Sequence, residues 1–177
     1  MRSWIDPEVK TPDESVASSQ LKAQAVGNAL KIPLVTVDLQ ERFFQDVVQT
    51  FIHNYTAGLT PNPCMLCNPQ IKWGSLQSVA LARGADFFAT GHYARIETSD
   101  SGGVRLLRGL DANKDQSYVL AMLSQDQLAR TRLPLGVLHK SEVLAYAKKL
   151  GLSAADEPES QDLCFLRSGD YRAFLRR

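Results

Sequence analysis

The chain has 177 residues, of which 44% are hydrophobic and 22% charged, and its formal net charge is +1 at pH 7. That length suits one domain with a core, or one domain and a short appendage. No apolar run approaches the roughly 18 residues that span a bilayer, and the N-terminus lacks the order of a secretory signal. Three cysteines, an odd number, argue against a secreted disulfide framework. We therefore expect a cytoplasmic protein with no membrane partner.

The first half of the chain predicts alternating helices and strands. Thr11-Pro12-Asp13-Glu14 has the N-cap, proline and capping-box glutamate of a helix start. The β-branched run over residues 32–38 predicts a buried strand. A second helix then ends at Gly58, and Asn68-Pro69 favours the start of a third that runs to about Gly84. The second helix carries an apolar stripe formed by Phe43, Phe44, Val47, Val48, Phe51, Ile52 and Tyr55.

The second half begins with a strand over residues 86–90, which Gly91-His92-Tyr93 follows directly. Residues 93–96 and 104–107 predict a β-hairpin. A helical turn over 117–123 precedes a capping box that starts at Ser124. The last clear amphipathic helix, closed by Gly151, carries Val143, Leu144, Ala147 and Leu150. The alternation predicts an α/β fold with a parallel sheet.

Both ends of the chain resemble cuts in a longer protein. The first predicted strand follows a helix, so we expect an earlier strand to be missing. The chain stops inside a helical pattern that carries Tyr171, Phe174 and Leu175.

All three cysteines lie among polar and turn-forming residues, in Thr60-Pro-Asn-Pro-Cys-Met-Leu-Cys-Asn68 and Ser160-Gln-Asp-Leu-Cys-Phe165. A thiol is a nucleophile only as the thiolate. With a helix start at Asn68-Pro69, the amide dipoles would favour a thiolate on Cys67, and Lys72 would add positive charge. The alternative is that these are small buried apolar side chains.

The Cys64-x-x-Cys67 pair alone is compatible with a redox pair, half a zinc site or part of an iron–sulfur site. Three cysteines exclude a four-sulfur zinc site, and no histidine has zinc-knuckle spacing to a cysteine. A three-cysteine cluster with one open position stays open as an alternative.

Two polar segments predict ligand contacts. Ala89-Thr-Gly-His-Tyr93 follows a strand, where open α/β sheets bind ligands, and Gly91 permits close backbone approach. Asn113-Lys-Asp-Gln-Ser-Tyr118 concentrates side chains that contact phosphates and bases. A turn glycine beside a partly exposed histidine, and a solvated loop, are the structural alternatives.

In this order, these segments resemble the tRNA-specific 2-thiouridylase family. The resemblance covers nearly the whole chain and includes Leu107-Arg-Gly, Leu133-Pro-Leu-Gly136 and Ser160-Gln-Asp-Leu-Cys-Phe165. It implies a Rossmann-like parallel sheet of the adenine-nucleotide alpha-hydrolase (ATP-pyrophosphatase) type, lacking its first strand and pyrophosphate loop, with a β-hairpin and a helical insert. Residues 1–165 would form the truncated catalytic domain, and residues 166–177 would begin the following tRNA-binding region.

The resemblance also implies a reaction, the 2-thiolation of the wobble uridine of tRNA. ATP, with Mg²⁺, would adenylate the C2 oxygen of that uridine. Cys164 would receive sulfur from a donor protein as a persulfide, and Cys67 would be its partner thiol, releasing sulfide or closing a disulfide with Cys164. The target base, flipped from its stack, would contact Asn62, Pro63 and Cys64.

The remaining contacts implied by the resemblance divide between nucleotide and tRNA. Met1 and Gly91 would contact ATP. His92 would contact tRNA together with the loop residues Lys114, Asp115 and Gln116.

Two departures from the family pattern bear on activity. The Ser-Gly-Gly-x-Asp-Ser loop that holds the ATP pyrophosphate is absent, and Ser101-Gly102-Gly103 does not replace it. The isolated chain is therefore expected to be inactive, and detectable thiolation by it would refute that expectation. Many members also carry aspartate at the place of Cys64, which here is a candidate acid/base group, a spare resolving thiol or a third iron–sulfur ligand.

Two other functions compete with the sulfurtransferase. One is a non-catalytic remnant or split subunit that binds tRNA or a sulfur-relay partner. The other is a related ATP-pyrophosphatase with another substrate, such as an ammonia-dependent amidotransferase. The paired thiols Cys67 and Cys164 count against this last function, which does not need them.

Overall fold

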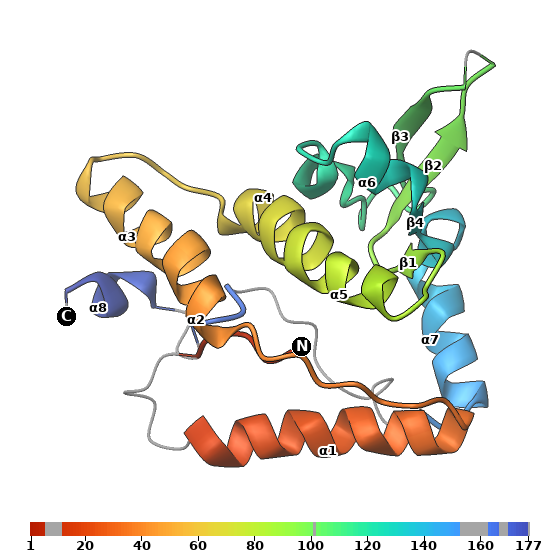
Figure 1. The fold of residues 1–177 in the computed structure, drawn as a ribbon, viewed down its shortest axis with the longest axis horizontal. Coiled ribbons are helices and arrows are strands. Elements are labelled where there is room, and N and C mark those ends of the chain that lie inside the picture. Colours follow the sequence, from red (N-terminus) through yellow and green to blue (C-terminus); the bar gives the residue numbers. More distant parts are fainter. Residues whose placement is uncertain (6–11, 101, 153–162, 167–169, 177) are drawn as a thin grey trace. The chain divides into compact units, whose positions relative to one another are not determined.

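The computed structural model (Figure 1) describes residues 1–5, 12–100, 102–152, 163–166 and 170–176. The chain divides into two compact units. Unit 1 comprises Met1–Pro61 and Pro158–Arg177, and unit 2 comprises Asn62–Glu157. Cys164 and Met1 belong to unit 1, whereas the other predicted site residues belong to unit 2.

The helices of unit 1 follow the sequence pattern closely. Helix α1 (Pro12–Leu30) starts at Pro12 as predicted, and the proposed N-cap at Thr11 lies outside the described residues. One continuous helix contains α2 (Gln40–Phe43), the π-helical turn η1 (Phe44–Val48) and α3 (Gln49–Thr56). It ends at Gly58, whose φ of 77° is the left-handed conformation that a helix C′ position favours.

The core of unit 1 is an aromatic cluster centred on Phe165. This side chain is 1% exposed, and its ring lies 5.3 Å from that of Phe51 and 5.9 Å from that of Phe43. Phe174 of helix α8 (Tyr171–Leu175) joins it at 6.1 Å, and Trp4 lies 6.5 Å away. The apolar stripe of the second helix is thus buried against the segment that carries Cys164, and α8 packs on the same cluster.

The prediction of a strand over residues 32–38 is wrong. Among the described residues, the pairing of this run is limited to an isolated parallel bridge between Arg2 and Asp38, in which Arg2 N donates to Val37 O at 2.8 Å. With so short a partner the β-branched side chains gain no ladder to pack against, and Ile32 and Val35 stay 56% and 51% exposed.

Unit 2 starts with a second continuous helix, formed by α4 (Pro63–Cys67), the π-helical segment η2 (Asn68–Leu76) and α5 (Gln77–Ala82). The predicted helix start at Asn68-Pro69 is therefore wrong, because the helix begins at the earlier Asn62-Pro63 pair. Pro69 instead lies inside the helix, where it cannot donate to the carbonyl four residues back. The wide π-helical turn at this position accommodates the missing hydrogen bond.

The strands of unit 2 are short. Strand β1 (Phe88–Ala89) pairs in parallel with β4 (Thr131–Arg132) over two residues of each strand. A parallel sheet was expected, but a strand at Thr131–Arg132 was not. The predicted hairpin is confirmed as β2 (Ala94–Thr98) and β3 (Val104–Arg108), with Ala94 opposite Arg108.

Three further helices in the described part of unit 2 match their sequence signals, whereas a fourth, over residues 134–137, was not predicted. They are η3 (Ser117–Leu120), α6 (Gln125–Ala129) with the predicted Ser124–Gln127 capping box, η4 (Pro134–Val137) and α7 (Lys140–Lys149), which ends before Gly151. The hydrophobic core of the unit combines Trp73, Ala94, Val119, Leu120, Leu123, Leu128 and Leu133. None of the helices in the described ranges is long and apolar enough to cross a membrane.

Candidate functional site

The first turn of α4 holds three of the predicted site residues together. The side chain of Asn62 caps the helix, because its Oδ1 accepts a hydrogen bond from the backbone N of Cys64 at 3.1 Å. Pro63 occupies the first helical position and is buried. Asn62 and Cys64 are exposed on this turn, so two of the three residues expected to contact a flipped base are accessible and the third, Pro63, is not.

The two cysteines of this turn differ in accessibility. Cys64 is exposed, whereas the side chain of Cys67, three residues later on the same helix, is only 7% exposed. Since the helix starts at Asn62, its positive end faces Cys64, and Cys67 lies one turn inside. The expected dipole effect on Cys67 therefore rested on the wrong helix start.

Two long-range hydrogen bonds fix the chain just after Cys67. The buried Asn68 donates from Nδ2 to the carbonyl of Val119 at 2.9 Å. Gln127 on α6 donates to the carbonyl of Pro69 at 3.2 Å. Both bonds hold the π-helical segment against η3 and α6, which keeps Cys67 facing the interior of unit 2.

The Gly91-His92 pair follows β1 directly, as predicted. Gly91 is exposed, and a Cβ placed on it would meet only Leu135, at 3.5 Å. The imidazole of His92 lies between two polar groups, with Nδ1 2.8 Å from Thr90 Oγ1 and Nε2 3.4 Å from Lys72 Nζ. Burial, followed by the positive charge of Lys72, lowers the pKa of His92 to about 4, so the ring is neutral at pH 7.

The loop of Lys114, Asp115 and Gln116 is tied to the start of the hairpin. Gln116 exchanges two hydrogen bonds with Tyr93, its N donating to Tyr93 O at 2.8 Å and its Oε1 accepting from Tyr93 N at 3.0 Å. Asp115 accepts from the backbone N of Gly109 at 2.8 Å and from Ser117. Burial raises the pKa of Asp115, but these hydrogen bonds outweigh it and hold the pKa below its usual range.

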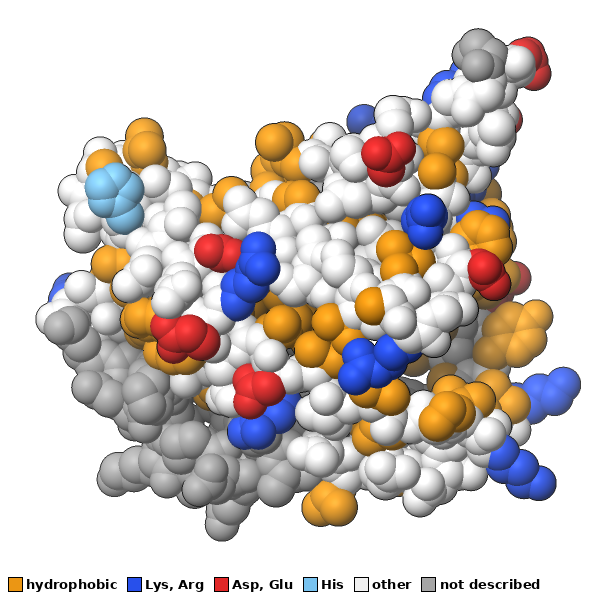
Figure 2. Space-filling view, viewed as in Figure 1, with side chains coloured by type: hydrophobic (Ala, Val, Ile, Leu, Met, Phe, Trp, Pro, Cys, Tyr) orange, Lys and Arg blue, Asp and Glu red, His pale blue; other side chains and the backbone are white. Residues whose placement is uncertain are grey.

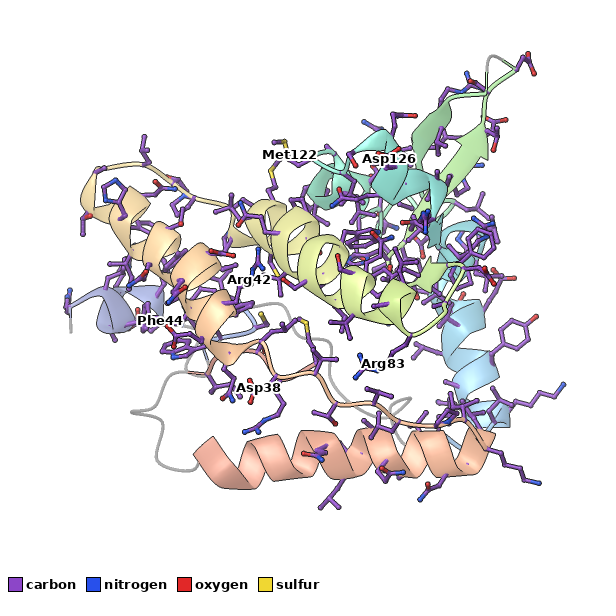
Figure 3. All side chains as sticks on the ribbon, viewed as in Figure 1. Asp38, Arg42, Phe44, Arg83, Met122 and Asp126 are labelled. Atoms are coloured by element: carbon purple, nitrogen blue, oxygen red, sulfur yellow. The ribbon has the colours of Figure 1, made fainter. Side chains whose placement is uncertain are left out.

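These contacts give Asp115 and Gln116 a structural role in the loop. The carboxylate of Asp115 and the amide oxygen of Gln116 accept hydrogen bonds within unit 2, so both shape the loop. The surface of unit 2 that is visible in Figure 2 intermingles acidic and basic side chains. Met122, 63% exposed, projects from the turn after η3 (Figure 3).

In unit 1, Cys164 is exposed in a turn, and the two residues after it are buried. Phe165 and Leu166 anchor this turn, which also has a hydrogen bond from Leu166 N to Leu163 O at 2.9 Å. Met1 lines a cavity of about 170 Å³ that mixes apolar walls such as Leu34 and Val35 with polar groups.

Sequence reasoning missed one feature of the site, the contact between Lys72 and His92. The two residues are 20 positions apart, and no helix or strand periodicity relates positions at that distance. The sequence offered one indirect indication, because both residues lie in segments that carry the family resemblance. Within the described ranges, no three His, Cys, Asp or Glu side chains come together to hold a metal ion.

Comparison with known proteins places this chain. Residues 1–168 match a family profile described as the tRNA methyl transferase HUP domain. The chain is 46% identical over 182 residues to the tRNA-specific 2-thiouridylase MnmA 1 of Caldanaerobacter subterraneus subsp. tengcongensis, covering 100% of this chain and 50% of that protein. It is 48% identical over 153 residues to MnmA of Mycobacterium sp. (strain KMS), covering 86% and 41%.

A third relative, MnmA of Enterococcus faecalis, is 40% identical over 178 residues, covering 99% of this chain and 46% of that protein. The chain thus spans about half the length of the curated relatives it matches. The family match includes both cysteine segments and has the Rossmann-like HUP fold class expected from the sequence. The chain belongs to the tRNA methyl transferase HUP domain family, and within it resembles the tRNA-specific 2-thiouridylases.

Proposed function

We propose that this chain acts in the ATP-dependent 2-thiolation of the wobble uridine of tRNA. The observation that carries the proposal is that both thiols of the sulfurtransferase pattern, Cys67 and Cys164, stand in segments within the matched residues 1–168. Three relatives named tRNA-specific 2-thiouridylase MnmA support it at 40–48% identity.

The reaction begins with activation of the base. The C2 oxygen of uridine attacks the α-phosphorus of ATP, and pyrophosphate leaves, so that AMP becomes the leaving group at C2. Met1, at the cavity of unit 1, and the exposed Gly91 would contact the nucleotide. Mg²⁺ commonly accompanies ATP, but no step proposed here depends on it.

Sulfur then reaches the activated carbon from a persulfide. A donor protein loads Cys164, which is accessible in its exposed turn. The thiolate of Cys67 attacks the inner sulfur of the persulfide, forms a Cys67–Cys164 disulfide and expels hydrosulfide. The hydrosulfide adds to C2 and AMP leaves, and an external thiol reduces the disulfide by two electrons for the next cycle.

The tRNA contacts are divided among the surfaces described above. The capped turn with Asn62, Pro63 and Cys64 would hold the flipped base. His92 and the loop of Lys114, Asp115 and Gln116 would contact the tRNA. Cys64 in this turn serves as an acid/base group or as a further thiol.

The direct test is sulfur loading of the reduced full chain by glutathione persulfide, followed by peptide mass spectrometry. We expect one added sulfur on Cys164, and then a Cys67–Cys164 disulfide with release of hydrosulfide. Cys67→Ser should instead accumulate the persulfide on Cys164. Loading that is unchanged in Cys164→Ser would contradict the proposed role of this residue.

Two further measurements separate the alternatives. Stoichiometric iron and sulfide after anaerobic purification would replace the cluster-free mechanism by an iron–sulfur variant with Cys64, Cys67 and Cys164. Binding of tRNA with no sulfur loading at either thiol would favour a binding-only role.

A further inference from the structure

Lys72 is a partly buried cation for which the structure records no carboxylate contact among the described residues. Its ammonium lies in unit 2 with Nζ 3.4 Å from Nε2 of His92. Elsewhere in the described chain, arginines such as Arg42 and Arg105 make ion pairs with carboxylates at 3.1 and 2.9 Å. Removing an ammonium from water without a counterion is costly, so the partly buried position of Lys72 needs a reason.

The protonation of the pair follows from its donors and acceptors. An ammonium group has only donors, so Nε2 of His92 accepts from Lys72. The neutral ring then carries its proton on Nδ1, which donates to Thr90 Oγ1 at 2.8 Å. Contact of the ring with Trp73, at 5.5 Å between centroids, holds its plane. His92 therefore orients Lys72 without cancelling its charge.

A backbone donor, the N–H of Gly91, directly precedes His92 in the sequence. Gly91 is exposed, and the structure records no hydrogen bond from its N–H to any described residue. A lysine ammonium held by His92 and the exposed glycine N–H that precedes His92, at the carboxyl end of a β-strand, are groups typical of a site for an oxyanion.

We propose that Lys72, positioned by His92 and assisted by the Gly91 N–H, forms a subsite for a phosphoryl group. The inference rests on the proposed function and names a residue for its first step. In that step the α-phosphoryl group gains negative charge as the C2 oxygen of uridine bonds to phosphorus and pyrophosphate departs. The ammonium of Lys72 would stabilise that charge. The same chemistry would suit a backbone phosphate of RNA, so the test includes both sources.

The experiment uses the full chain labelled with ¹⁵N-histidine at neutral pH. Before any addition, His92 is expected in the Nδ1–H form. Sodium phosphate and AMP should each shift the Nε2 resonance of His92, while His53 and His139 serve as internal references. At matched ionic strength, Lys72→Met should abolish the shift and weaken AMP binding by about tenfold or more, the effect of a lost charge-assisted hydrogen bond.

Two variants make the result specific. Lys72→Arg retains the cation and should restore most of the AMP affinity, whereas Lys148→Met, on α7, should behave like the wild type. Adenylyl-adenosine, which has an internucleotide phosphate and no terminal one, separates the two sources. A shift with it and none with AMP would assign the subsite to the RNA backbone, and a shift with AMP alone would assign it to the nucleotide.

The proposal is overturned if neither probe shifts His92, or if Lys72→Met responds as the wild type does. Sulfur loading of Cys164 by glutathione persulfide is measured on the same Lys72→Met protein. Because that reaction has no phosphoryl step, it should proceed at the wild-type rate. Failure of the anion subsite and failure of the proposed sulfur transfer therefore give different results.

Discussion

The two units hold Cys164 and Cys67 by different physical means. In unit 1, Cys164 stands in an exposed turn that is fastened by apolar packing, since Phe165 is buried among aromatic rings. In unit 2, Cys67 is itself buried, and hydrogen bonds from Asn68 and Gln127 fix its helix. The exposed thiol of Cys164, fixed by apolar packing, is accessible to a sulfur donor in solution. The buried thiol of Cys67, on a helix fixed by hydrogen bonds, can react only with a group that reaches the interior of unit 2.

Two tryptophans allow this comparison to be tested one unit at a time. Trp4 belongs to the aromatic cluster of unit 1, and Trp73 to the core of unit 2. The chain contains only these two. In a Trp73→Phe background the fluorescence reports unit 1, and in a Trp4→Phe background it reports unit 2.

The largest effect is expected from Phe165→Ala. The change leaves a cavity in the aromatic cluster and should lower the free energy of unfolding of unit 1 by about 3–5 kcal/mol. Urea unfolding followed by Trp4 fluorescence measures it, with Phe87→Ala, at a side chain 50% exposed, as the control. An equal loss reported by Trp73 in unit 2 would show that the anchor does not act locally.

Gly136→Ala should disrupt unit 2. A Cβ at this position would stand 1.7 Å from the carbonyl oxygen of Ala94, so backbone must move. We expect destabilisation of about 3 kcal/mol or more in Trp73-monitored unfolding. Gly91→Ala is the matched control, because its Cβ makes only an ordinary contact with Leu135. Similar stability of the two variants would contradict the close approach of η4 and β2.

The stability of unit 2 should fall in mild acid, because the pKa of His92 is lowered to about 4 by burial and by Lys72. Between pH 6.5 and pH 4, His92 is protonated in the unfolded state but stays neutral in the folded state. The contribution of neutral His92 to the stability of unit 2 is therefore complete above pH 6.5 and is lost progressively toward pH 4. The loss between pH 6.5 and 5 is at most about 2 kcal/mol, and His92→Gln should flatten this part of the profile. A Trp73-monitored profile equally steep in His92→Gln would assign the loss to other groups.

The smallest effect is expected at the helix cap. Asn62→Ala removes the acceptor for Cys64 N and should cost about 1 kcal/mol in unit 2. Asn62→Asp keeps the cap, and should keep the stability, while changing the group offered to a base. Sulfur loading of Cys164 should be equal in both variants, and a stability loss in Asn62→Asp as large as in Asn62→Ala would show that the cap is not what stabilises this turn.

Local patterns in the sequence were sufficient for much of the fold. The stripe from Phe43 to Tyr55, the Ser124 capping box and the hairpin were all predictable, because each depends on residues a few positions apart. The start of the helix at Asn62 was not, because two Asn-Pro pairs six positions apart carry the same signal. Long-range hydrogen bonds determine which pair starts the helix, because Val119 and Gln127 hold the second pair, Asn68-Pro69, inside it.

The strand expected over residues 32–38 shows the same limit, since a strand requires a partner that a local pattern cannot provide. For the candidate site, the sequence segment alone brought Asn62, Cys64 and Cys67 close together along the chain. It could not show that Cys64 is exposed and Cys67 buried, nor that Lys72 meets His92. Those facts depend on how η2 packs against the segment after β1.

The burial of Cys67 inside a capped helix implies a kinetic gate. A reagent in solution should alkylate Cys64 and Cys164 at once, and Cys67 only through transient fraying of α4. The rate at Cys67 then reports the local opening free energy of that turn rather than the nucleophilicity of its sulfur. A bound substrate that pulled the turn open would make Cys67 react faster when a base was in place than by fraying alone, which would limit wasteful discharge of the persulfide into water.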